Sequence, residues 1–580
     1  MRIRLGKNSD SSERISIDDD LLRTHMHLVG ATGAGKTTAI HAILRQLMSG
    51  VGDDKSCIFV IDPMGNLSRD LLKIMAYERY VTNSARERLL YIEPAREDVV
   101  TPFNPLHYTT EANRYYQTMR AVDLVLRAWE AQDVAQQPRL LQWTYKAFCA
   151  AAQVGFPISI CRFLLHPGSD YHKAIINRIP GEIGNQWQQI LHAKGGEAVR
   201  ILESTRNRLD PFFESPNLRM MFGVQQNRFD CERMIRERKI VIVNLAKQGN
   251  VPGFISDTVG ALMLNEIFET ASRLAVTEGR SVVEPTYIFL DEFQRYVSGD
   301  IEDALPTVRQ MGLRLILAHQ SFAQLEREDV DLEQMIWQAR TRLAFASYQK
   351  DADIIADEIA KMTFNDMEIK DKRTSKRQLI DGYKKEILRS WSESTSDSAS
   401  ESKSSGQANN SSQNSVYPFG ESSPASTSRG SGSSENRGSG ESMGRTAGRT
   451  SGESEHLTPN HVTFDEVSNV TYRSFEEHSL RWGKRLRSLK AGEAMLQTPG
   501  SADIKPVKID HLRVPDTPEV REKVERLLEK NFASDFFMKM EDARREHELC
   551  LQQIVDGALP KLSAGKPQAK ESDPHRPFTL

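Results

Sequence analysis

The sequence contains no long hydrophobic run. No window reaches about 18 uninterrupted apolar residues, the length that a membrane-spanning helix needs. The N-terminal residues are basic but lack the apolar stretch of a signal peptide. We therefore expect a cytoplasmic protein without direct membrane insertion.

Cysteine is scarce as well. The five cysteines, at positions 57, 149, 161, 231 and 550, show no paired spacing. This distribution argues against a disulfide framework or a zinc knuckle and indicates a reducing compartment. We interpret the cysteines as packing residues.

A strong net charge is also absent. There are 76 Lys and Arg residues against 79 Asp and Glu residues, so the formal net charge is −3 and the pI is about 6.6. A surface that binds nucleic acid must therefore be a local patch or channel, because the chain has no overall positive field. The length of 580 residues predicts two folded domains, or one with a large insertion, plus disordered parts.

The chain does contain a complete phosphate-binding motif. An apolar strand ends at Gly30, and after four residues the sequence reads Gly35-Lys36-Thr37. In this pattern backbone N–H groups wrap the phosphates, and glycines remove the side chains that would block their approach. We expect a helix from about Lys36 to Met48, with Lys36 on the β- and γ-phosphates and Thr37 on Mg²⁺. The predicted nucleotide-binding residues are Gly30, Ala31, Thr32, Gly33, Ala34, Gly35, Lys36, Thr37 and Thr38.

A second motif supplies the acids that hydrolysis requires. The apolar run 287–290 ends in Asp291 and Glu292. Such a run predicts a buried parallel strand whose carboxyl end opens onto the ligand crevice. We expect Asp291 to hold Mg²⁺ and Glu292 to act as the general base for water.

A third apolar strand, residues 313–318, ends in His319 and Gln320. An amide at such a strand tip can sense the γ-phosphate, and we assign this role to Gln320. We interpret His319 as a structural histidine, with a role at the site as the alternative. Arg309, just before the strand, is the candidate arginine finger that reaches the nucleotide of a neighbouring subunit. Its competitors are Arg314, Arg340 and Arg342.

Alternating strands and helices predict the fold class. Further apolar strands lie near 56–62 and 239–245, and the first ends in Asp62, which either approaches the nucleotide or caps the next helix. We expect an α/β P-loop NTPase fold with a doubly wound, mainly parallel sheet of the RecA-like type. The region 110–238 changes to helical periodicity and predicts an inserted all-α domain. Its polar residues line either a DNA path or a solvated face.

The C-terminal third combines a low-complexity stretch with ordered segments. Residues 391–455 are rich in Ser and Gly, and we expect a disordered linker because this composition buries little apolar surface. A β-hairpin is expected from Leu489 to about 509, followed by an amphipathic helix that docks on a partner or on its own core. The predicted division is 1–109 motor domain, 110–238 all-α insertion, 239–390 motor domain, 391–455 linker, 456–515 C-terminal strands of the motor domain, 516–556 amphipathic helix and 557–580 disordered tail.

These motifs together resemble the TraD/TraG-like coupling ATPases of type IV secretion and conjugation, within the HerA/FtsK superfamily of ring-forming DNA pumps. The resemblance rests on residues 27–38, 61–65, 103–106, 289–293 and 312–321. It implies ATP and Mg²⁺ as cofactors, a hexamer around single- or double-stranded DNA, and partners such as a relaxase or secretion-channel proteins. ATP is favoured over GTP because no guanine-reading motif is evident.

The chain departs from this family in two ways. Typical coupling proteins begin with membrane-spanning helices, whereas here the phosphate-binding motif starts within the first forty residues. This departure argues against direct membrane anchoring, and a partner could recruit the protein to the inner membrane. The Ser/Gly-rich stretch interrupts the expected C-terminal part of the motor domain.

Three functions compete on this basis. The leading hypothesis is an ATP-hydrolysing, DNA-binding translocase of the conjugative type. The alternatives are a HerA-like motor that processes DNA, and a nucleotide-gated adaptor that recruits protein cargo to a secretion channel through its helical domain and flexible tether.

Overall fold

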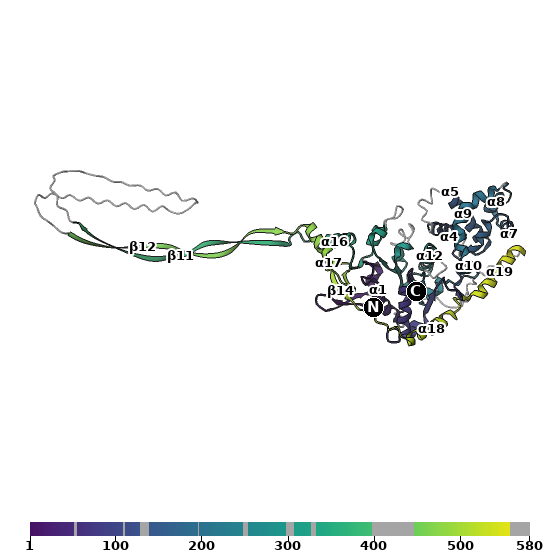
Figure 1. The fold of residues 1–580 in the computed structure, drawn as a ribbon, viewed down its shortest axis with the longest axis horizontal. Coiled ribbons are helices and arrows are strands. Elements are labelled where there is room, and N and C mark those ends of the chain that lie inside the picture. The colour runs from purple at the N-terminus through teal and green to yellow at the C-terminus, as the bar shows by residue number, and fades with distance from the viewer. Residues whose placement is uncertain are drawn as a thin grey trace, which may run out of the picture. The chain divides into compact units, whose positions relative to one another are not determined.

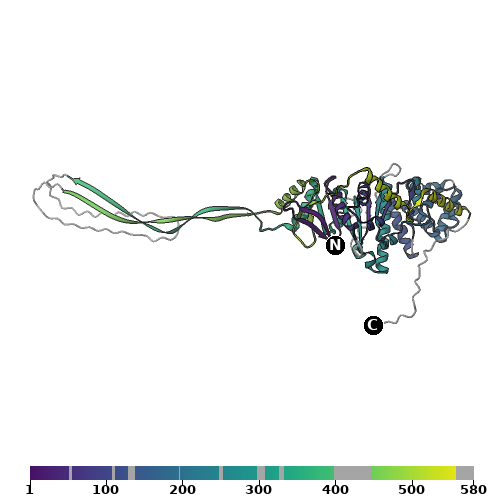
Figure 2. The same ribbon diagram turned by 90° about the horizontal axis from the view of Figure 1, so that it is seen from below.

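The computed structural model describes residues 1–50, 55–107, 111–127, 138–194, 196–246, 253–296, 307–325, 332–396 and 446–556. The chain divides into two compact units. The first combines residues 1–366 with 474–580, and the second contains residues 367–473. Figures 1 and 2 show both.

The first unit is built on an 11-stranded sheet with the order β2-β1-β14-β13-β10-β3-β9-β8-β4-β7-β5. All neighbours from β10 to β5 are parallel, and all neighbours from β2 to β10 are antiparallel. The predicted α/β fold with a mainly parallel sheet is thereby confirmed. The strands are β1 Arg2–Asn8, β2 Arg14–Asp18, β3 Met26–Val29, β4 Cys57–Asp62, β5 Leu89–Ile92, β7 Ile240–Asn244, β8 Thr286–Asp291, β9 Leu313–His319, β10 Thr341–Phe345, β13 Glu493–Gln497 and β14 Lys505–Ile509.

The central, parallel strands are apolar on both faces. In β4, Phe59 and Ile61 belong to one hydrophobic cluster, whereas Ile58 and Val60 belong to another. A sheet that is buried on both sides needs a helical layer on each face. Helices α1 (Lys36–Met48) and α2 (Asn66–Ala76) contribute to the second cluster, and α12 (Gly253–Thr277) and α16 (Gln349–Thr363) to the first.

Between 111 and 238 the described residues form helices and no strand, and Figure 1 shows most of these helices gathered together. They are α4 Glu111–Arg127, α5 Pro138–Val154, α6 Cys161–Leu164, α7 Asp170–Ile176, α8 Gly181–Leu191, α9 Glu197–Glu214, α10 Pro216–Met221 and α11 Cys231–Arg236. The remaining helices of the unit are α3 Asn83–Glu87, α13 Arg280–Val283, α15 Leu332–Trp337, α17 Phe475–Arg487, α18 Pro518–Phe532 and α19 Met540–Asp556. No helix in these ranges is long and apolar enough to cross a bilayer. All five cysteines are buried and free.

The C-terminal segment differs from its prediction. The expected single helix over 516–556 is wrong, because α18 and α19 are separated by a turn and by the short strand β15 (Met538–Lys539). Phe536 and Phe537, which lie between the two helices, are both buried. Strand β15 pairs with β6 (Val99–Val100), and α18 packs on α2, so the segment docks on its own core.

Asn531, at the end of α18, joins this segment to the sheet through two side-chain hydrogen bonds. Its side-chain oxygen accepts from the backbone N–H of Tyr91 at 2.8 Å, and its Nδ2 donates to the Tyr91 carbonyl at 3.0 Å. Tyr91 lies on β5, the edge strand of the sheet, so the asparagine completes the ladder as a further strand would.

We expect Asn531→Ala to lower the free energy of unfolding by about 2 kcal/mol, because a buried N–H and a buried carbonyl lose their partner. Urea unfolding followed by circular dichroism measures this change. Glu529→Ala, at an exposed position of the same helix, is the control and is expected to stay close to wild type. Equal stability of the two variants would contradict the edge-strand role of Asn531.

The second unit is a two-stranded antiparallel sheet of β11 (Ile369–Ser396) and β12 (Thr446–Tyr472). The expectation of a disordered linker over 391–455 is wrong for 391–396 and 446–455, which are strand residues; the rest of that stretch lies outside the described residues. Likewise, 369–390 and 456–472 belong to this hairpin rather than to the motor sheet. The composition argument failed because ladder hydrogen bonds join backbone groups and need no apolar side chains. The predicted tail, 557–580, also lies outside the described residues.

Candidate nucleotide-binding site

The phosphate-binding motif forms the turn between β3 and α1. Gly33 has φ 77° and Gly35, which precedes the first turn of α1, has φ 117°, both in the region that favours glycine. The backbone N–H groups at the start of the 13-residue helix α1 therefore face the turn, where the positive end of the helix dipole attracts an anion. Residues 30–38 thus have the geometry that their sequence predicts.

Lys36 lies inside this turn. Its side chain is buried, and Nζ donates hydrogen bonds to the backbone carbonyls of Gly30 and Ala31. Burial lowers the pKa of Lys36, and the negative charges of Glu292 and Asp291 oppose this shift. The lysine and the acidic pair therefore lie close together, although Lys36 and Asp291 are 255 residues apart in the sequence.

The acidic pair lies at the carboxyl end of β8, which is separated from β3 by β9 alone. Burial, together with the nearby carboxylates of Glu292 and Asp62, raises the pKa of Asp291 to about 6. Glu292 is buried and adopts φ 50° and ψ 50°, a left-handed conformation that is uncommon for a residue with a side chain. Such strain persists where the surroundings fix it, and it is typical of functional sites.

Gln320 joins the phosphate-binding turn to the acidic pair. The Thr32 hydroxyl donates to Gln320 Oε1 at 2.6 Å, and Gln320 Nε2 donates to Glu292 Oε1 at 2.6 Å. The structure therefore brings together three of the residues predicted for the site, and the glutamine lies between the other two. An amide in this position contacts both the phosphate-binding turn and the predicted base.

Gln294 is a site residue that the sequence did not reveal. Its Nε2 donates to the second oxygen of Glu292 at 2.9 Å and contacts Gln324 Oε1 at 3.3 Å. The 3₁₀ turn Phe293–Arg295 and the left-handed Glu292 direct this side chain back to the carboxylate. No sequence signal marks it, because a glutamine two residues after an acid is ordinary.

The β13–β14 hairpin and the segment after β10 also contact the phosphate-binding turn. The backbone N–H of Gly492 donates to the carbonyl of Ala34 at 2.8 Å, and that of Ala31 donates to Ala346 at 2.8 Å. A Cβ atom on Gly35 would lie 2.9 Å from Gly492. Segments after β10 and before β13 therefore hold the turn from outside, a contact that the motif itself cannot reveal.

The structure shows the contacts of two residues for which the sequence left alternatives open. Asp62 caps α2: its carboxylate accepts from the backbone N–H groups of Met64, Gly65 and Ser68 at 2.7–2.9 Å. His319 is buried, its Nε2 lies 2.8 Å from that of His27, and burial lowers its pKa to about 4. A neutral, stacked histidine pair is a structural feature, as we expected for His319.

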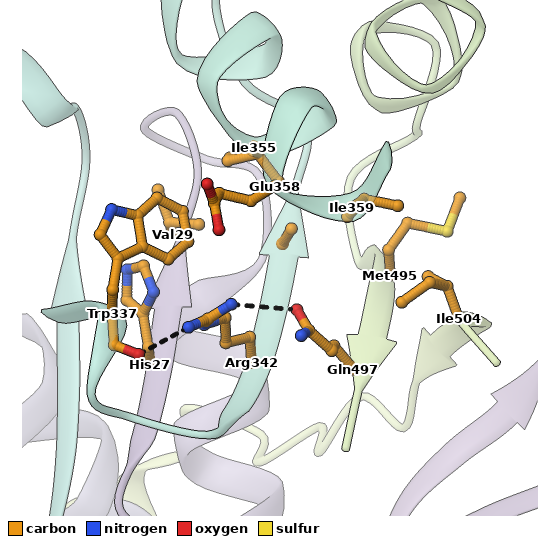
Figure 3. A pocket seen from close by; sticks show the side chains of 11 residues that line it. His27, Val29, Trp337, Arg342, Ile355, Glu358, Ile359, Met495, Gln497 and Ile504 are labelled. Carbon is orange, nitrogen blue, oxygen red and sulfur yellow. Dashed lines mark hydrogen bonds between the residues drawn. The ribbon is translucent and has the colours of Figure 1, made fainter. Parts of the chain in front are cut away.

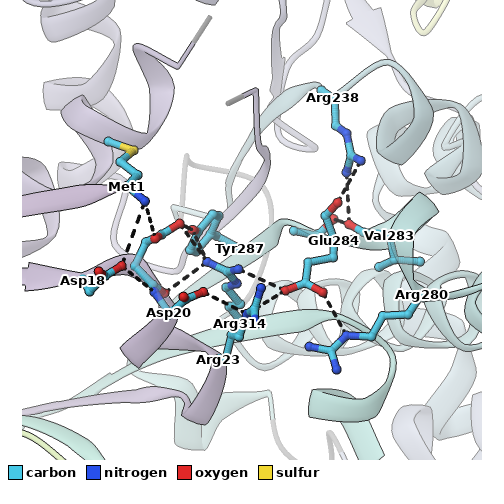
Figure 4. A network of polar contacts seen from close by, with 12 residues as sticks. Met1, Asp18, Asp20, Arg23, Arg238, Arg280, Val283, Glu284, Tyr287 and Arg314 are labelled. Carbon is cyan, nitrogen blue, oxygen red and sulfur yellow. Dashed lines mark hydrogen bonds and ion pairs between the residues drawn. The ribbon is translucent and has the colours of Figure 1, made fainter. Parts of the chain in front are cut away.

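Two of the competing arginines have partners inside this unit. Arg342 donates to the Trp337 carbonyl at 2.7 Å and contacts Gln497 in a small pocket beside His27 (Figure 3). Arg314 is 4% exposed and contacts Tyr287, Asp19 and Glu284 (Figure 4).

Arg309 and Arg340 are exposed and remain candidates for a finger. The hydrogen bonds of the site, in the described part of the chain, do not include Arg309. An arginine that acts on a neighbouring subunit has to be exposed in a single chain. The exposed position of Arg309 is compatible with this requirement, and its role as a finger stays a prediction.

The donor set suits magnesium and a nucleotide. Thr37 offers a hydroxyl and Asp291 a carboxylate, the hard oxygen ligands that Mg²⁺ prefers. No group of three or more His, Cys, Asp or Glu side chains in the described ranges is arranged to hold a metal.

The raised pKa of Asp291 has a consequence for stability. Above pH 6 this carboxylate is charged in the folded and the unfolded chain, and burial penalises the folded one. We expect Asp291→Asn to stabilise the nucleotide-free protein by about 2 kcal/mol at pH 8. The difference should shrink as the pH falls from 6 to 4, where the folded wild type takes up its proton first. Thermal unfolding at several pH values tests this, with exposed Asp503→Asn as the control. A pH-independent difference would contradict the expected cause.

Two family models match the chain. Residues 3–267 match "Helicase HerA, central domain", and residues 285–451 match "TraM recognition site of TraD and TraG". The first match includes the phosphate-binding turn, and the second begins at the strand that carries the acidic pair. They confirm the resemblance to TraD/TraG-like coupling ATPases. No curated protein matches the chain.

Solved structures of a conjugative coupling protein are similar to the chain. They include TrwBdeltaN70 in an unbound monoclinic form (12% identity, TM-score 0.46, covering 89% of this chain and 91% of that one). Another is plasmid coupling protein TrwB in complex with ADP and Mg²⁺ (12% identity, TM-score 0.44, covering 87% and 89%). A third is TrwB in complex with the non-hydrolysable ATP analogue ADPNP (12% identity, TM-score 0.44, covering 90% and 96%).

Proposed function

We propose that this chain is an ATP-hydrolysing, DNA-binding translocase of the conjugative and type IV secretion coupling type. The observation that carries the proposal is the hydrogen-bonded series from Thr32 through Gln320 to Glu292. It joins a phosphate-binding turn to a carboxylate that can polarise water, which is what phosphoryl transfer to water requires. The family-model matches support the coupling class.

Each residue then has one task. Lys36 holds the β- and γ-phosphates, and Thr37 and Asp291 hold Mg²⁺, which neutralises charge on the phosphates when bound. Glu292 polarises the attacking water. Gln320 responds to the γ-phosphate, because it contacts both the turn that binds phosphate and the base.

Assembly and partners form the second part of the proposal. Subunits assemble as a homo-oligomer, a hexamer by the family resemblance, and Arg309 of one subunit completes the site of the next. DNA is the substrate that the ring moves. A relaxase or other relaxosome protein is the partner class that the match to a TraM recognition site supports. A channel protein recruits the ATPase to the inner membrane.

DNA-dependent ATP hydrolysis tests this function. We expect the purified protein to hydrolyse ATP, single- or double-stranded DNA to accelerate the reaction, and Glu292→Gln to lower both the accelerated and the basal rate about a thousandfold. Absence of DNA stimulation, together with absence of DNA binding at low salt, would refute the translocase. Displacement of a protein roadblock from DNA separates a translocase from an adaptor that uses ATP only as an assembly switch.

A second candidate is a HerA-like motor that processes DNA. The match of residues 3–267 to the HerA central domain supports it. Capture of a nuclease partner by the purified, tagged protein would favour this motor, whereas capture of a relaxase would favour the coupling function.

A further inference from the structure

The β11–β12 hairpin is a two-stranded sheet in the part of the chain that the structure describes. Its strands are 28 and 27 residues long, and within the described residues they pair only with each other. Two-stranded hairpins are at best marginally stable in water, and three or more strands or a packed face are needed for stability. Each outer edge also presents unpaired N–H and C=O groups along its length.

One face of the hairpin gathers large apolar side chains where β11 passes Tyr383, between the ion pairs Lys385–Glu455 and Arg389–Glu453. Successive side chains in a strand alternate between faces, so Tyr383, Ile387 and Trp391 lie on one face, and they are 63%, 56% and 70% exposed. Leu457, directly opposite Lys385, lies on the same face and is 61% exposed. On the opposite face, Leu388 lies across from Ser454, and Glu386 lies across from His456. Polar side chains therefore surround Leu388. The four large apolar side chains that are exposed on the face of Tyr383 favour contact with a partner.

The two strands carry opposite charge. Strand β11 has eight Lys and Arg residues against four Asp and Glu residues, whereas β12 has one against four. Inside the hairpin this contrast produces cross-strand ion pairs, including Arg389–Glu453 at 2.7 Å and Lys385–Glu455 at 2.8 Å. These pairs are exposed, so the acidic groups remain open to a basic strand on their other side.

The charges select one arrangement for a second copy of the chain. An edge contact between two β11 strands would place cations opposite cations, and a contact between two β12 strands would place acids opposite acids, both of which are unfavourable. We propose that β11 of one copy pairs with β12 of the next, antiparallel, so that basic and acidic strands alternate through a sheet shared between subunits. The contact uses different surfaces on the two copies, and a closed rotation turns it into a ring whose apolar face is covered.

Cross-linking tests the choice of edges. The variants Ser375→Cys on β11 and Asn469→Cys on β12 place single exposed thiols in the full chain, whose own cysteines are all buried. With a short bis-maleimide, the mixture of the two variants is expected to form more cross-linked dimer than either variant alone, because β11 and β12 of different copies are neighbours whereas two β11 strands are separated by one strand. More cross-linking of Ser375→Cys with itself than with Asn469→Cys would overturn the alternation. Absence of any cross-link would overturn self-association and leave a different protein as the cover.

Assembly measurements test the apolar face. Ile387 and Leu388 are adjacent, and each is 56% exposed, but they point to opposite faces. By mass photometry or sedimentation, Ile387→Asn is expected to raise the protein concentration needed for assembly by about tenfold, and Leu388→Asn by less than about twofold. Equal effects would overturn the proposal. Nucleotide binding by both variants shows that the first unit is folded, and a failure of ATP hydrolysis would leave this result unaffected.

Discussion

Glu292→Gln is expected to lower kcat for ATP hydrolysis about a thousandfold, within the range seen when a general base is removed. ATP binding should persist, because we assign the phosphate contacts to residues 30–38, which the substitution leaves unchanged. The substitution keeps the size of the side chain and its acceptor for Gln320, but it removes the negative charge that polarises water. Single-turnover hydrolysis, together with the Kd of a fluorescent ATP analogue, separates the two effects.

The neighbouring glutamines provide a graded series for the same measurement. Gln320→Met removes the link between Thr32 and the base, and we expect a loss of about a hundredfold in kcat. Gln294→Met removes one donor to the far oxygen of Glu292 and should cost about tenfold, since the base itself remains. A Glu292→Gln protein that keeps a tenth of the wild-type kcat would contradict the assignment of the base.

The strands around the site could be predicted because their sequences carry two signals at once. Strands β4, β8 and β9 are apolar runs that are buried on both faces, and each ends in an acid or a polar tip. Parallel strands bring those tips to one edge, so Asp62, Asp291 and Gln320 had to gather near the phosphate-binding turn. Their separate tasks could not be read in this way, since a helix cap and a metal ligand use the same carboxylate.

The antiparallel part of the sheet was harder to predict. Strand β1 does alternate, with Ile3 and Leu5 buried, but its charged residues led us to see only a basic N-terminus. Its partner β14 lies about five hundred residues later in the chain, and the pairing of two distant strands leaves no trace in either sequence. The hairpin β11–β12 was missed for a related reason, because its stability depends on ladder hydrogen bonds and, as we propose, on other copies.

Contacts that approach the site from the C-terminal segment were also beyond the sequence. Gly492 follows a helix and precedes a strand, and a glycine there reads as an ordinary turn. Only the structure places its N–H on the carbonyl of Ala34. The phosphate-binding turn therefore contacts a segment more than four hundred residues away. Its glycines should differ in how strongly a substitution affects nucleotide binding.

Gly35→Ala is expected to weaken ATP binding by about a hundredfold or more, as a lost backbone cradle does. Its Cβ would lie 2.9 Å from both Cα and N of Gly492, and its φ of 117° is unfavourable for alanine. Either the phosphate-binding turn or the β13–β14 hairpin must move, and in both cases the N–H groups of the turn leave the positions that suit phosphate. Isothermal titration with ATP and Mg²⁺ measures the loss.

The partner glycine supplies the matched control. Gly492 has φ 81°, but a Cβ there would meet no atom within 4 Å, so Gly492→Ala adds only the strain of about 1–2 kcal/mol for a left-handed residue. If that strain destabilises the hairpin without moving the turn, ATP affinity should fall by less than about fivefold. The two substitutions therefore differ. A methyl group on Gly35 would collide with the backbone of Gly492, whereas a methyl group on Gly492 would point into open space. Equal loss of affinity in the two variants would show that backbone strain, and not the close approach of the two segments, sets the shape of the turn.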